Sequence, residues 1–444
     1  MDLKLPASEL DRISTALLAF APEEGAAFLA VQGSGPRMVL RSTKIFDRAE
    51  LEAGEFGELT LSEDAQMSGL AEIKRSGAGL VEVHTHPGSR ERVRFSSFDE
   101  DQLPRFARYF SNKLPGRPFG ALVLGNSGYE GRYWNGESFE PLNLEPVGER
   151  RRIPAWASTG VQVAVKPQFD RQVRALGVEG QRCLSALRVG VVGLGGTGSQ
   201  VVQQLSHLGV RKLILVDADR VEDTNLPRLA GVAWWDVLLR RKKSAVAKRL
   251  VRRIRPQLRI QTAGDLRSER ALTLLAGTDL IVGCVDNDGA RLVLSELASA
   301  HLIPYLDIGV GIERENFAAE IGGRVGFHVP GGPCLACADE LDFAESAEDL
   351  EPQGLKAIRV QRGYATDRTV EPALMPLNTV LVGLAMTELL AYVTGVRSVI
   401  PFSRYDLVEG RIVSQNVERN PLCVVCSSAA GMGDSADIAR YSRG

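Results

Sequence analysis

Apolar and polar positions alternate differently in two parts of the chain, and they predict two units of different kinds. In the first part, short apolar runs such as AAFLAV and AGLVEV stand between polar, glycine-rich turns, as is typical of strands. A helix is expected over residues 8–20, with Ser8 as its N-cap. The strands expected here cover residues 26–31, 78–83, 119–124 and 129–134, the last two as a hairpin. This pattern predicts a mixed α+β unit.

Beyond residue 186 the pattern changes to apolar runs that alternate with amphipathic helices. Strands are expected at residues 187–192, 212–216 and 280–285, and helices at 198–208 and 237–254. Such alternation specifies βαβ units and a parallel sheet covered by helices on both faces. The second unit is therefore expected to be a Rossmann-like, doubly wound α/β fold.

The stretch between the two patterns reads as a linker. Residues 146–167 lose strong periodicity and carry a charge run at 149–152. We therefore place a first domain at residues 1–145 and a second at 168–426. Residues 427–444 are small and polar and are expected to form a flexible tail.

The composition narrows the range of functions. The 444 residues include 53 Lys plus Arg and 55 Asp plus Glu, and the formal net charge of −2 argues against binding of nucleic acid or anionic membrane. No uninterrupted apolar stretch approaches the roughly 18 residues of a membrane span, and the start, MDLKLPASELDR, does not resemble a secretory signal. We expect a cytoplasmic protein whose cysteines stay reduced.

A glycine-rich turn predicts a nucleotide site. Between the first strand and helix of the second unit the chain reads G-x-G-G-x-G, and Asp217 lies nineteen residues after its last glycine. Glycines at such a turn let backbone N–H groups approach phosphates, and a carboxylate at the end of the next strand can accept hydrogen bonds from ribose. Alone, this pattern fits a nicotinamide-dependent dehydrogenase, an ATP-using enzyme or a tight structural turn. The four glycines are Gly193, Gly195, Gly196 and Gly198.

Polar residues after this turn favour an adenylating enzyme. Asn225 and Arg228 follow Asp217 closely, and a dehydrogenase has no evident use for them. An enzyme that transfers AMP must hold the triphosphate with cationic and amide donors and bind magnesium. Lys243 adds a second cation, and Asp286 in GCVDN adds a carboxylate suited to Mg²⁺.

The six cysteines fall into two pairs and two single residues. Cys334 with Cys337 and Cys423 with Cys426 each form C-x-x-C, and two such pairs can close a tetrahedral zinc site. Because protein ligands fill all four positions, we interpret this zinc as structural. The single residues, Cys183 and Cys284, are expected in the core.

A second metal site is predicted in the first unit. His84 and His86 stand at the end of an apolar strand in VEVHTHPGS, where alternate side chains point to the same side. Asp99 can supply a third zinc ligand and leave a position for water. Such a catalytic zinc needs a carboxylate that accepts the proton of this water, and Glu24 is the expected residue.

The second unit resembles a known family over residues 168–426. FDRQVRALGVEGQ, VVGLGGTGS, DADRVEDTNLPR, Lys243 and CVDN are similar to motifs of the ubiquitin-activating-enzyme-like (ThiF/MoeB-type) adenylyltransferases, which carry the same paired cysteine knuckles. The resemblance implies ATP, with Asp217 at the ribose, Asn225, Arg228 and Lys243 at the triphosphate, and Asp286 at magnesium. It implies that Arg171 reaches the nucleotide of a partner subunit, in a homodimer. The implied substrate is the C-terminal glycine of a ubiquitin-like β-grasp protein.

One departure from this family concerns a thioester-forming cysteine. Many members carry one in the loop before the helix at residues 375–394, but residues 361–372 here read QRGYATDRTVEP. We therefore expect adenylation followed by transfer to an external thiol, which leaves room for an E2-like conjugating protein as a second partner.

The first unit resembles the JAMM/MPN metalloproteases over residues 1–140. A distant Glu, His-x-His-Pro and Ser-x-x-Asp match that signature, which implies zinc on His84, His86 and Asp99, Glu24 as general acid/base and Ser96 at the oxyanion. His86 and Asp99 are twelve residues apart, about two more than is usual in that family, so Asp101 remains an alternative ligand. Glu23 likewise remains an alternative to Glu24.

Together these features predict a fusion of a zinc isopeptidase with a ubiquitin-like-protein adenylyltransferase. The first domain would trim a precursor or cleave a conjugate, and the second would activate the exposed carboxylate. A second hypothesis is sulfur-carrier activation, in which the adenylate becomes a thiocarboxylate for metabolite biosynthesis. A catalytically silent scaffold is a third hypothesis, against which the complete motifs in both halves argue, and a dehydrogenase is a fourth.

Overall fold

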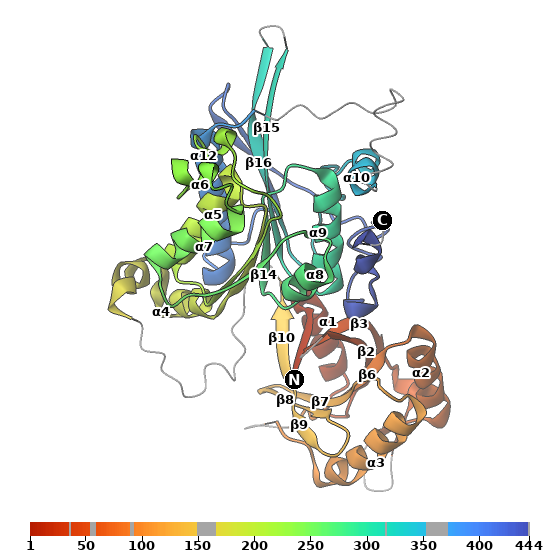
Figure 1. The fold of residues 1–444 in the computed structure, drawn as a ribbon. Helices are drawn as coiled ribbons and strands as arrows, with labels where there is room; N and C mark the ends of the chain where they lie inside the picture. Colours follow the sequence, from red (N-terminus) through yellow and green to blue (C-terminus); the bar gives the residue numbers. More distant parts are fainter. Residues whose placement is uncertain are drawn as a thin grey trace.

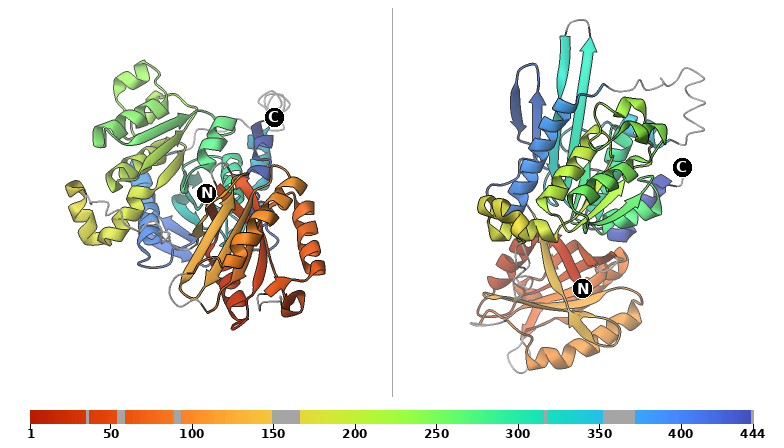
Figure 2. Two further views of the ribbon diagram at one scale, coloured as in Figure 1. Left: turned by 90° about the horizontal axis from the view of Figure 1, so that it is seen from below. Right: turned by 60° about the vertical axis from the view of Figure 1, so that its left-hand side comes forward.

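A computed structural model gives the fold in two units, each built on an eight-stranded sheet (Figure 1). The N-terminal unit packs against one end of the second unit, and the long hairpin of β15 (Tyr305–Glu315) and β16 (Ala318–His328) extends away from it at the opposite end (Figure 2). The described residues are 1–34, 37–53, 59–88, 93–148, 166–315, 318–351 and 372–442.

The sheet of the first unit has the order β10-β1-β3-β2-β6-β7-β8-β9. At its centre β6 (Gly79–Thr85) pairs antiparallel with β2 (Ala26–Ser34) and parallel with β7 (Phe119–Gly125). The remaining strands are β1 (Asp2–Pro6), β3 (Arg37–Ile45), β8 (Gly128–Trp134), β9 (Phe139–Pro141) and β10 (Asn143–Val147), with a separate hairpin of β4 (Leu51–Ala53) and β5 (Leu59–Leu61). The four strands predicted here are confirmed, with boundaries shifted by up to three residues.

Helices cover both faces of this sheet. Helix α1 (Ala7–Leu18) packs its buried Ile13 and Leu17 on one face, and α2 (Glu63–Ser76) and α3 (Ser97–Lys113) pack on the other. The predicted N-cap at Ser8 is wrong. The helix begins at Ala7, and Pro6, whose ring fixes φ near the observed −59°, stands at the N-cap without a side-chain hydrogen bond.

The second unit is the predicted Rossmann-like sheet, extended by antiparallel strands. Its order is β13-β12-β11-β14-β15-β16-β17-β18, in which the pairs from β13 to β15 are parallel and the later ones antiparallel. The prediction of a parallel sheet is therefore correct only for its first half. The strands are β11 (Arg188–Val192), β12 (Lys212–Val216), β13 (Arg259–Ala263), β14 (Leu280–Gly283), β15 (Tyr305–Glu315), β16 (Ala318–His328), β17 (Phe402–Asp406) and β18 (Arg411–Gln415).

Helices on the two faces of this sheet bury separate cores. Helices α5, α7 and α12 share one hydrophobic cluster with the sheet, and α8 and α9 share the other. Their bounds, with those of the smaller helices, are α4 (Asp170–Ala186), α5 (Gly196–Leu208), α6 (Trp234–Leu238), α7 (Lys243–Ile254), α8 (Glu269–Ala276), α9 (Asp288–Ala300), α10 (Phe343–Leu350) and α12 (Met375–Thr394). The helix expected at 237–254 is two helices, because Arg240 takes a left-handed φ of 44° that interrupts the turn.

Helix α12 alone, among the described helices, is long and apolar enough to cross a membrane by length and composition. Its apolar residues have another explanation, since α12 packs against α5, β15 and β16 and buries Leu381, Ala385 and Leu389. An amphipathic pattern is absent because the core surrounds much of this helix.

The interface between the units lies at the amino ends of the parallel strands of the second unit. Buried Arg37 donates to the Asp279 carboxylate at 2.8 Å, and Arg188 at the start of β11 shares that carboxylate. Gly431, with a φ of 66°, approaches so closely that a Cβ there would lie 1.9 Å from the Leu40 carbonyl oxygen. Residues 427–442 of the expected flexible tail instead pack here and bury Ile438, because their few apolar side chains join the core.

Candidate functional site

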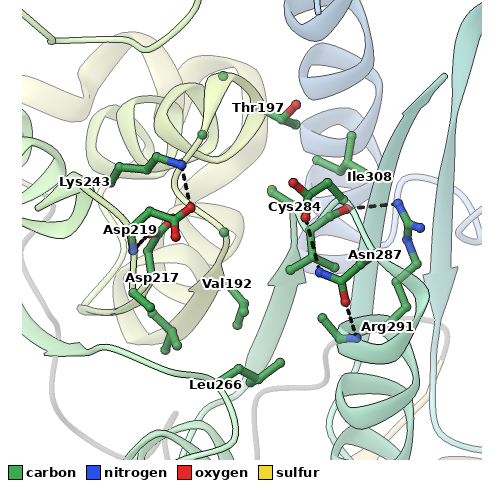
Figure 3. Close-up of a pocket in the computed structure, with 18 of the residues that line it drawn as sticks. Val192, Thr197, Asp217, Asp219, Lys243, Leu266, Cys284, Asn287, Arg291 and Ile308 are labelled. Carbon is green, nitrogen blue, oxygen red and sulfur yellow. Dashed lines mark hydrogen bonds and ion pairs between the residues drawn. The ribbon is translucent and has the colours of Figure 1, made fainter. Parts of the chain in front are cut away.

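A cavity of about 670 Å³ opens at the carboxyl ends of β11, β12 and β14 (Figure 3). It lies at the end of the sheet opposite to the interface with the first unit. In open α/β sheets, ligands bind at this edge. The site residues that line the cavity are Gly193, Gly195, Gly196, Asp217, Arg228, Lys243 and Asp286, as the sequence predicts.

The four glycines of the turn serve three different purposes. Gly193 has a φ of 82°, and a Cβ there would lie 2.3 Å from the Cys284 carbonyl oxygen. Gly198 does not line the cavity; its added Cβ would lie 1.8 Å from the Gly193 carbonyl oxygen, so it lets α5 begin tightly against the turn. Gly195 and Gly196 face the cavity at the N-terminus of α5, where unpaired N–H groups attract phosphate.

Asp217 is held in place by the backbone. One carboxylate oxygen accepts a hydrogen bond from Leu194 N at 2.7 Å and the other from Asp219 N at 2.7 Å. Burial raises the pKa of Asp217, against the opposing effects of Lys243 and of these two N–H groups. A fixed carboxylate at the strand end can accept hydrogen bonds from ribose hydroxyls.

Two cations face the phosphate side of the cavity. Lys243 Nζ lies 2.8 Å from the Asp219 carboxylate (Figure 3), and Lys243 N donates to the Asp219 carbonyl at 2.9 Å. Arg228 lines the cavity next to Gly196. Asp219 was not predicted as a site residue, although it lies two residues after Asp217 in LVDADR.

Asp286 lies on the turn that connects β14 to α9. Asn287 caps α9 by accepting from Ala290 N at 2.8 Å, and its Nδ2 donates to Asp286 Oδ1 at 3.2 Å. The turn therefore presents an exposed carboxylate at the mouth of the cavity, beside the phosphate-binding turn. Oxygen ligands of this kind suit Mg²⁺ bound to nucleotide phosphates.

The four paired cysteines meet in a buried cluster. The Sγ atom of Cys334 lies 3.8 Å from that of Cys337 and 3.7 Å from that of Cys423, and the Sγ atoms of Cys337 and Cys426 lie 3.6 Å apart. In a tetrahedral site with Zn–S bonds of about 2.3 Å, sulfurs lie about 3.8 Å apart. The cluster therefore fits a four-thiolate zinc site.

A second cluster in the first unit brings together His84, His86 and Asp99. His84 Nε2 lies 3.4 Å from Asp99 Oδ1, and His86 Nε2 lies 3.6 Å from Asp99 Oδ2. Ligand atoms in a tetrahedral zinc site with bonds of about 2.0–2.1 Å lie roughly 3.3–3.4 Å apart. His84 Nε2 is buried and has no hydrogen-bond partner among the described residues. A nitrogen that binds a metal ion would also lack such a partner.

Hydrogen bonds to neighbouring groups orient the side chains of His86 and Asp99. His86 Nδ1 bonds to the Arg94 carbonyl at 2.9 Å, which leaves Nε2 as the acceptor nitrogen. Ser96 caps α3, and its N and Oγ donate to Asp99 Oδ2 at 2.7 and 2.8 Å. Ser96 thus holds the Asp99 carboxylate, a contact that the sequence analysis did not predict.

The structure separates the alternative carboxylates in the first unit. Glu24 Oε1 lies 3.4 Å from His86 Nε2, whereas Glu23 turns outward to an ion pair with Arg48. Asp101 likewise pairs with Arg105 at 3.1 Å on the surface of α3, away from the histidines. Glu24 and Asp99, rather than their neighbours, are therefore the carboxylates at the cluster.

Sequence reasoning missed Glu82, which lies two residues before His84 on the same face of β6. With His84, His86 and Asp99 it lines a cavity of about 540 Å³. Burial raises the pKa of Glu82 to about 7, although nearby His84 opposes this. For His84 itself, burial alone would lower the pKa, but Asp99, Glu82 and Glu24 raise it above its ordinary value. The cluster therefore concentrates negative charge around the histidines.

Comparison with known proteins identifies the family of the second unit. The sequence model of the ThiF family matches residues 169–425, more than half of the chain. The chain belongs to the ThiF family. We call the matched residues the ThiF unit.

Curated relatives share this unit. The molybdopterin-synthase adenylyltransferase of Escherichia coli K12 is 29% identical over 266 residues, which cover 58% of this chain and 95% of that protein. The ubiquitin-like modifier-activating enzyme 5 of Drosophila willistoni is 28% identical over 257 residues, 53% of this chain and 56% of that protein. This chain thus spans little more than half the length of the Drosophila relative.

Two further matches are more limited. The SAMP-activating enzyme E1 of Haloferax volcanii is 33% identical over 177 residues, 38% of this chain and 62% of that protein. A crystal structure of E. coli MccB with MccA-N7isoASN aligns with a TM-score of 0.49 and 20% identity, over 60% of this chain and 76% of that chain.

Some predicted residues of the ThiF unit lie outside its cavity. Asn225 is buried, does not line the cavity, and its Oδ1 accepts from Glu222 N at 3.1 Å. Arg171 lies exposed on α4 and does not line the cavity of its own chain, so its role toward a partner subunit stays a prediction. Residues 361–371 of the loop where a thioester cysteine was considered lie outside the described residues.

The cavity of the ThiF unit also includes residues that the sequence analysis did not name. Asn378, at the start of α12, is buried against Gly196, and no local signal links it to a turn about 180 residues earlier. Arg291 on α9 lines the cavity as well. Cys183 is buried in the core as predicted, whereas Cys284 is only partly buried and also lines the cavity.

Proposed function

We propose that the ThiF unit adenylates the C-terminal glycine of a ubiquitin-like β-grasp protein. The observation that carries this proposal is the cavity that combines a phosphate-binding turn, a fixed ribose carboxylate, two cations and Asp286. One relative is named as a ubiquitin-like modifier-activating enzyme and another as a molybdopterin-synthase adenylyltransferase, which favours a carrier protein as the acyl substrate.

The reaction follows from this arrangement. A terminal carboxylate oxygen of the partner attacks the α-phosphorus of ATP, the bond to the bridging oxygen breaks, and pyrophosphate leaves with the electron pair. Lys243 and Arg228 would stabilise the charge that develops on the phosphates. Asp217 would hold the ribose, and Asp286 would hold Mg²⁺, which when bound neutralises phosphate charge. Arg171 from the other subunit of a homodimer would complete the site.

A second cavity gives the tail of the partner a path to this site. A groove of about 790 Å³ shares Asp286 and Arg291 with the nucleotide cavity. Part of its floor is bare, because a Cβ added to Gly311 of β15 would meet no atom within 4 Å, whereas the Arg324 side chain lies over Gly309. Glycine in a strand allows close approach of another backbone. We propose that the extended tail lies on this floor.

Pyrophosphate exchange into ATP tests the adenylation. Wild-type protein should exchange pyrophosphate only when a tail-bearing partner is present, because the acyl-adenylate must form first. Lys243→Ala should lower the exchange rate by about 100-fold or more. Lys242→Ala, an exposed neighbour at the N-cap of α7, is the matched control and should exchange normally. Exchange that continues without any partner would contradict the proposal.

For the first unit we propose a zinc-dependent peptidase or isopeptidase of the JAMM/MPN kind that acts on the same tail. His84, His86 and Asp99 would hold zinc, which when bound lowers the pKa of a water. Glu24, 3.4 Å from His86, would accept the proton of that water and later donate it to the leaving amine. Ser96 would keep Asp99 oriented. Because its hydroxyl has a single proton, donation to an oxyanion would require Ser96 Oγ to release Asp99.

A matched pair of variants tests the cleavage. Glu24→Gln should reduce hydrolysis of a tail-extended partner by about 100-fold or more and leave adenylation of the mature partner unchanged. Glu23→Gln, which loses only a surface ion pair with Arg48, should cleave normally. Equal loss in both variants, or normal cleavage by Glu24→Gln, would contradict the assignment.

Sulfur-carrier activation remains the second proposed outcome for the adenylate. The absence of cysteine in residues 361–372 favours it, since a thioester on this loop is not available to pass the acyl group to a conjugating protein. Mass spectrometry of the partner decides between them. A thiocarboxylate would show sulfur transfer, and a bond to lysine would show conjugation through an E2-like protein.

A further inference from the structure

Arg291 lies between the nucleotide cavity and the groove and lines both. It is in the first turn of α9, and its side chain is only 12% exposed. Its Nη2 donates to the Val285 carbonyl at 2.9 Å, and its Nη1 donates to Asp288 Oδ1 at 2.6 Å. One guanidinium thus joins the start of α9 to the backbone that precedes Asp286.

The turn that carries Asp286 has few other anchors. Strand β14 ends at Gly283, and Cys284 N donates to the Val192 carbonyl at 2.8 Å. Asn287 caps α9, so it fixes the far end of the turn. Between these points the Val285 carbonyl is bound by Arg291, and that contact decides where the next peptide unit points.

Buried charges hold Arg291 in turn. Asp307 on β15 is fully buried, with Oδ1 3.7 Å from Arg291 Nε and Oδ2 3.6 Å from Arg324 Nε. The Tyr305 hydroxyl donates to Asp307 Oδ1 at 2.8 Å. A buried cation needs a nearby opposite charge, and Asp307 supplies it from β15. The side chain of Arg291 is therefore fixed from two directions.

We propose that Arg291, held by Asp307, is a positioning residue that orients the Val285–Asn287 turn so that Asp286 faces the metal and phosphates. This inference rests on the proposed adenylation, in which Asp286 holds Mg²⁺. Arg291 lines both cavities, but in this role it acts on the turn rather than on either reactant. Its effect passes through the Val285 carbonyl, as with outer contacts that orient the ligands of a metal site.

Metal binding without turnover tests this role. Binding of Mn²⁺ is measured by electron paramagnetic resonance in the presence of an ATP analogue with a methylene bridge between the α- and β-phosphates. Arg291→Ala should weaken Mn²⁺ binding by about tenfold, in the range found for outer-contact changes, and leave the affinity for the metal-free analogue within about twofold. Arg291→Lys keeps the charge beside Asp307 but not the paired contacts, so it should fold normally and show the same weakening.

A double-mutant cycle separates positioning from general loosening. In an Asp286→Ala background, Arg291→Ala should cause no further loss of Mn²⁺ affinity, because the side chain that it positions is already missing. Arg397→Gln removes a comparable part-buried pair with Glu388 beyond the end of α12 and serves as the control for stability. Wild-type Mn²⁺ affinity in Arg291→Lys, or a tenfold loss that persists without Asp286, would overturn the proposal.

Failure of the proposed function would look different. If wild-type protein bound neither the analogue nor Mn²⁺, both the adenylation and the role of Arg291 would be overturned. If wild-type protein bound both and the Arg291 variants did so equally well, only the positioning role would be overturned.

Discussion

The cysteine cluster and the histidine cluster differ in what surrounds them. Three of the four cysteines are buried, and the cluster packs within a hydrophobic core together with Leu335 and Ile438. The side chains of His84, His86 and Asp99 are 15–18% exposed and line an open cavity of about 540 Å³. Structural zinc sites are closed by four protein ligands, whereas catalytic sites keep a position for water. The same chain therefore has one cluster suited to stability and one suited to chemistry.

The largest expected effect is on the cysteine cluster. Cys426→Ala should lower the unfolding temperature of the ThiF unit by about 10 °C or more, because zinc binding contributes directly to folding. His84→Ala should change the unfolding temperature by less than about 3 °C while abolishing cleavage. Differential scanning calorimetry of both variants measures this contrast. Equal losses of stability would remove the distinction between the two clusters.

A smaller effect is expected from the contact that holds Asp99. Ser96→Ala should reduce cleavage by about 10- to 100-fold and stability by about 1 kcal/mol, since it removes both an outer contact of a metal ligand and a helix cap. Ser62→Ala is the matched control, because Ser62 caps α2 by accepting from Ala65 N and lies outside the cluster. It should lose similar stability and no activity. Reduced cleavage in both variants would show that Ser96 acts only through stability.

The smallest expected effect is a pH dependence of the first unit without metal. The folded-state pKa of His84 is raised, with Asp99 the main group that opposes desolvation. The stability from this shift is fully present below the unfolded pKa of about 6.5 and is lost as pH rises through the higher folded pKa. Chelator-treated protein should therefore unfold at a temperature a few degrees higher at pH 6 than at pH 8. His84→Gln should reduce this difference and leave the part that comes from Glu82, whose pKa burial raises to about 7. An undiminished difference would assign it to another group.

The sequence could predict sites whose residues are close together or follow a strict spacing. His84 and His86 alternate on one strand, and the cap at Ser96 places Asp99, so local geometry brings these ligands together. Each cysteine pair has the C-x-x-C spacing that is typical of zinc sites. Glycine and acidic motifs at successive strand ends predicted most of the nucleotide cavity, because the carboxyl ends of parallel strands meet at one edge.

The remaining features depend on contacts between distant segments. Nothing near Asn378 indicates that α12 returns to the glycine turn, and the ion pair of Asp219 with Lys243 joins a strand end to a separate helix. The antiparallel extension of the sheet was missed because β15 and β16 contain glycines and polar residues that obscure alternation. The break at Arg240 was missed because apolar spacing continues across it.

One experiment tests the central claim that two chemistries on this chain act on one tail. A partner with residues beyond its terminal glycine is incubated with the protein, Zn²⁺ and Mg²⁺–ATP, and its intact mass is measured. The account predicts that the mass first falls by the extension and then rises by AMP, with only the first change in Lys243→Ala and neither in Glu24→Gln. An adenylate on the unshortened partner, or a partner that the protein leaves unchanged, would contradict the account.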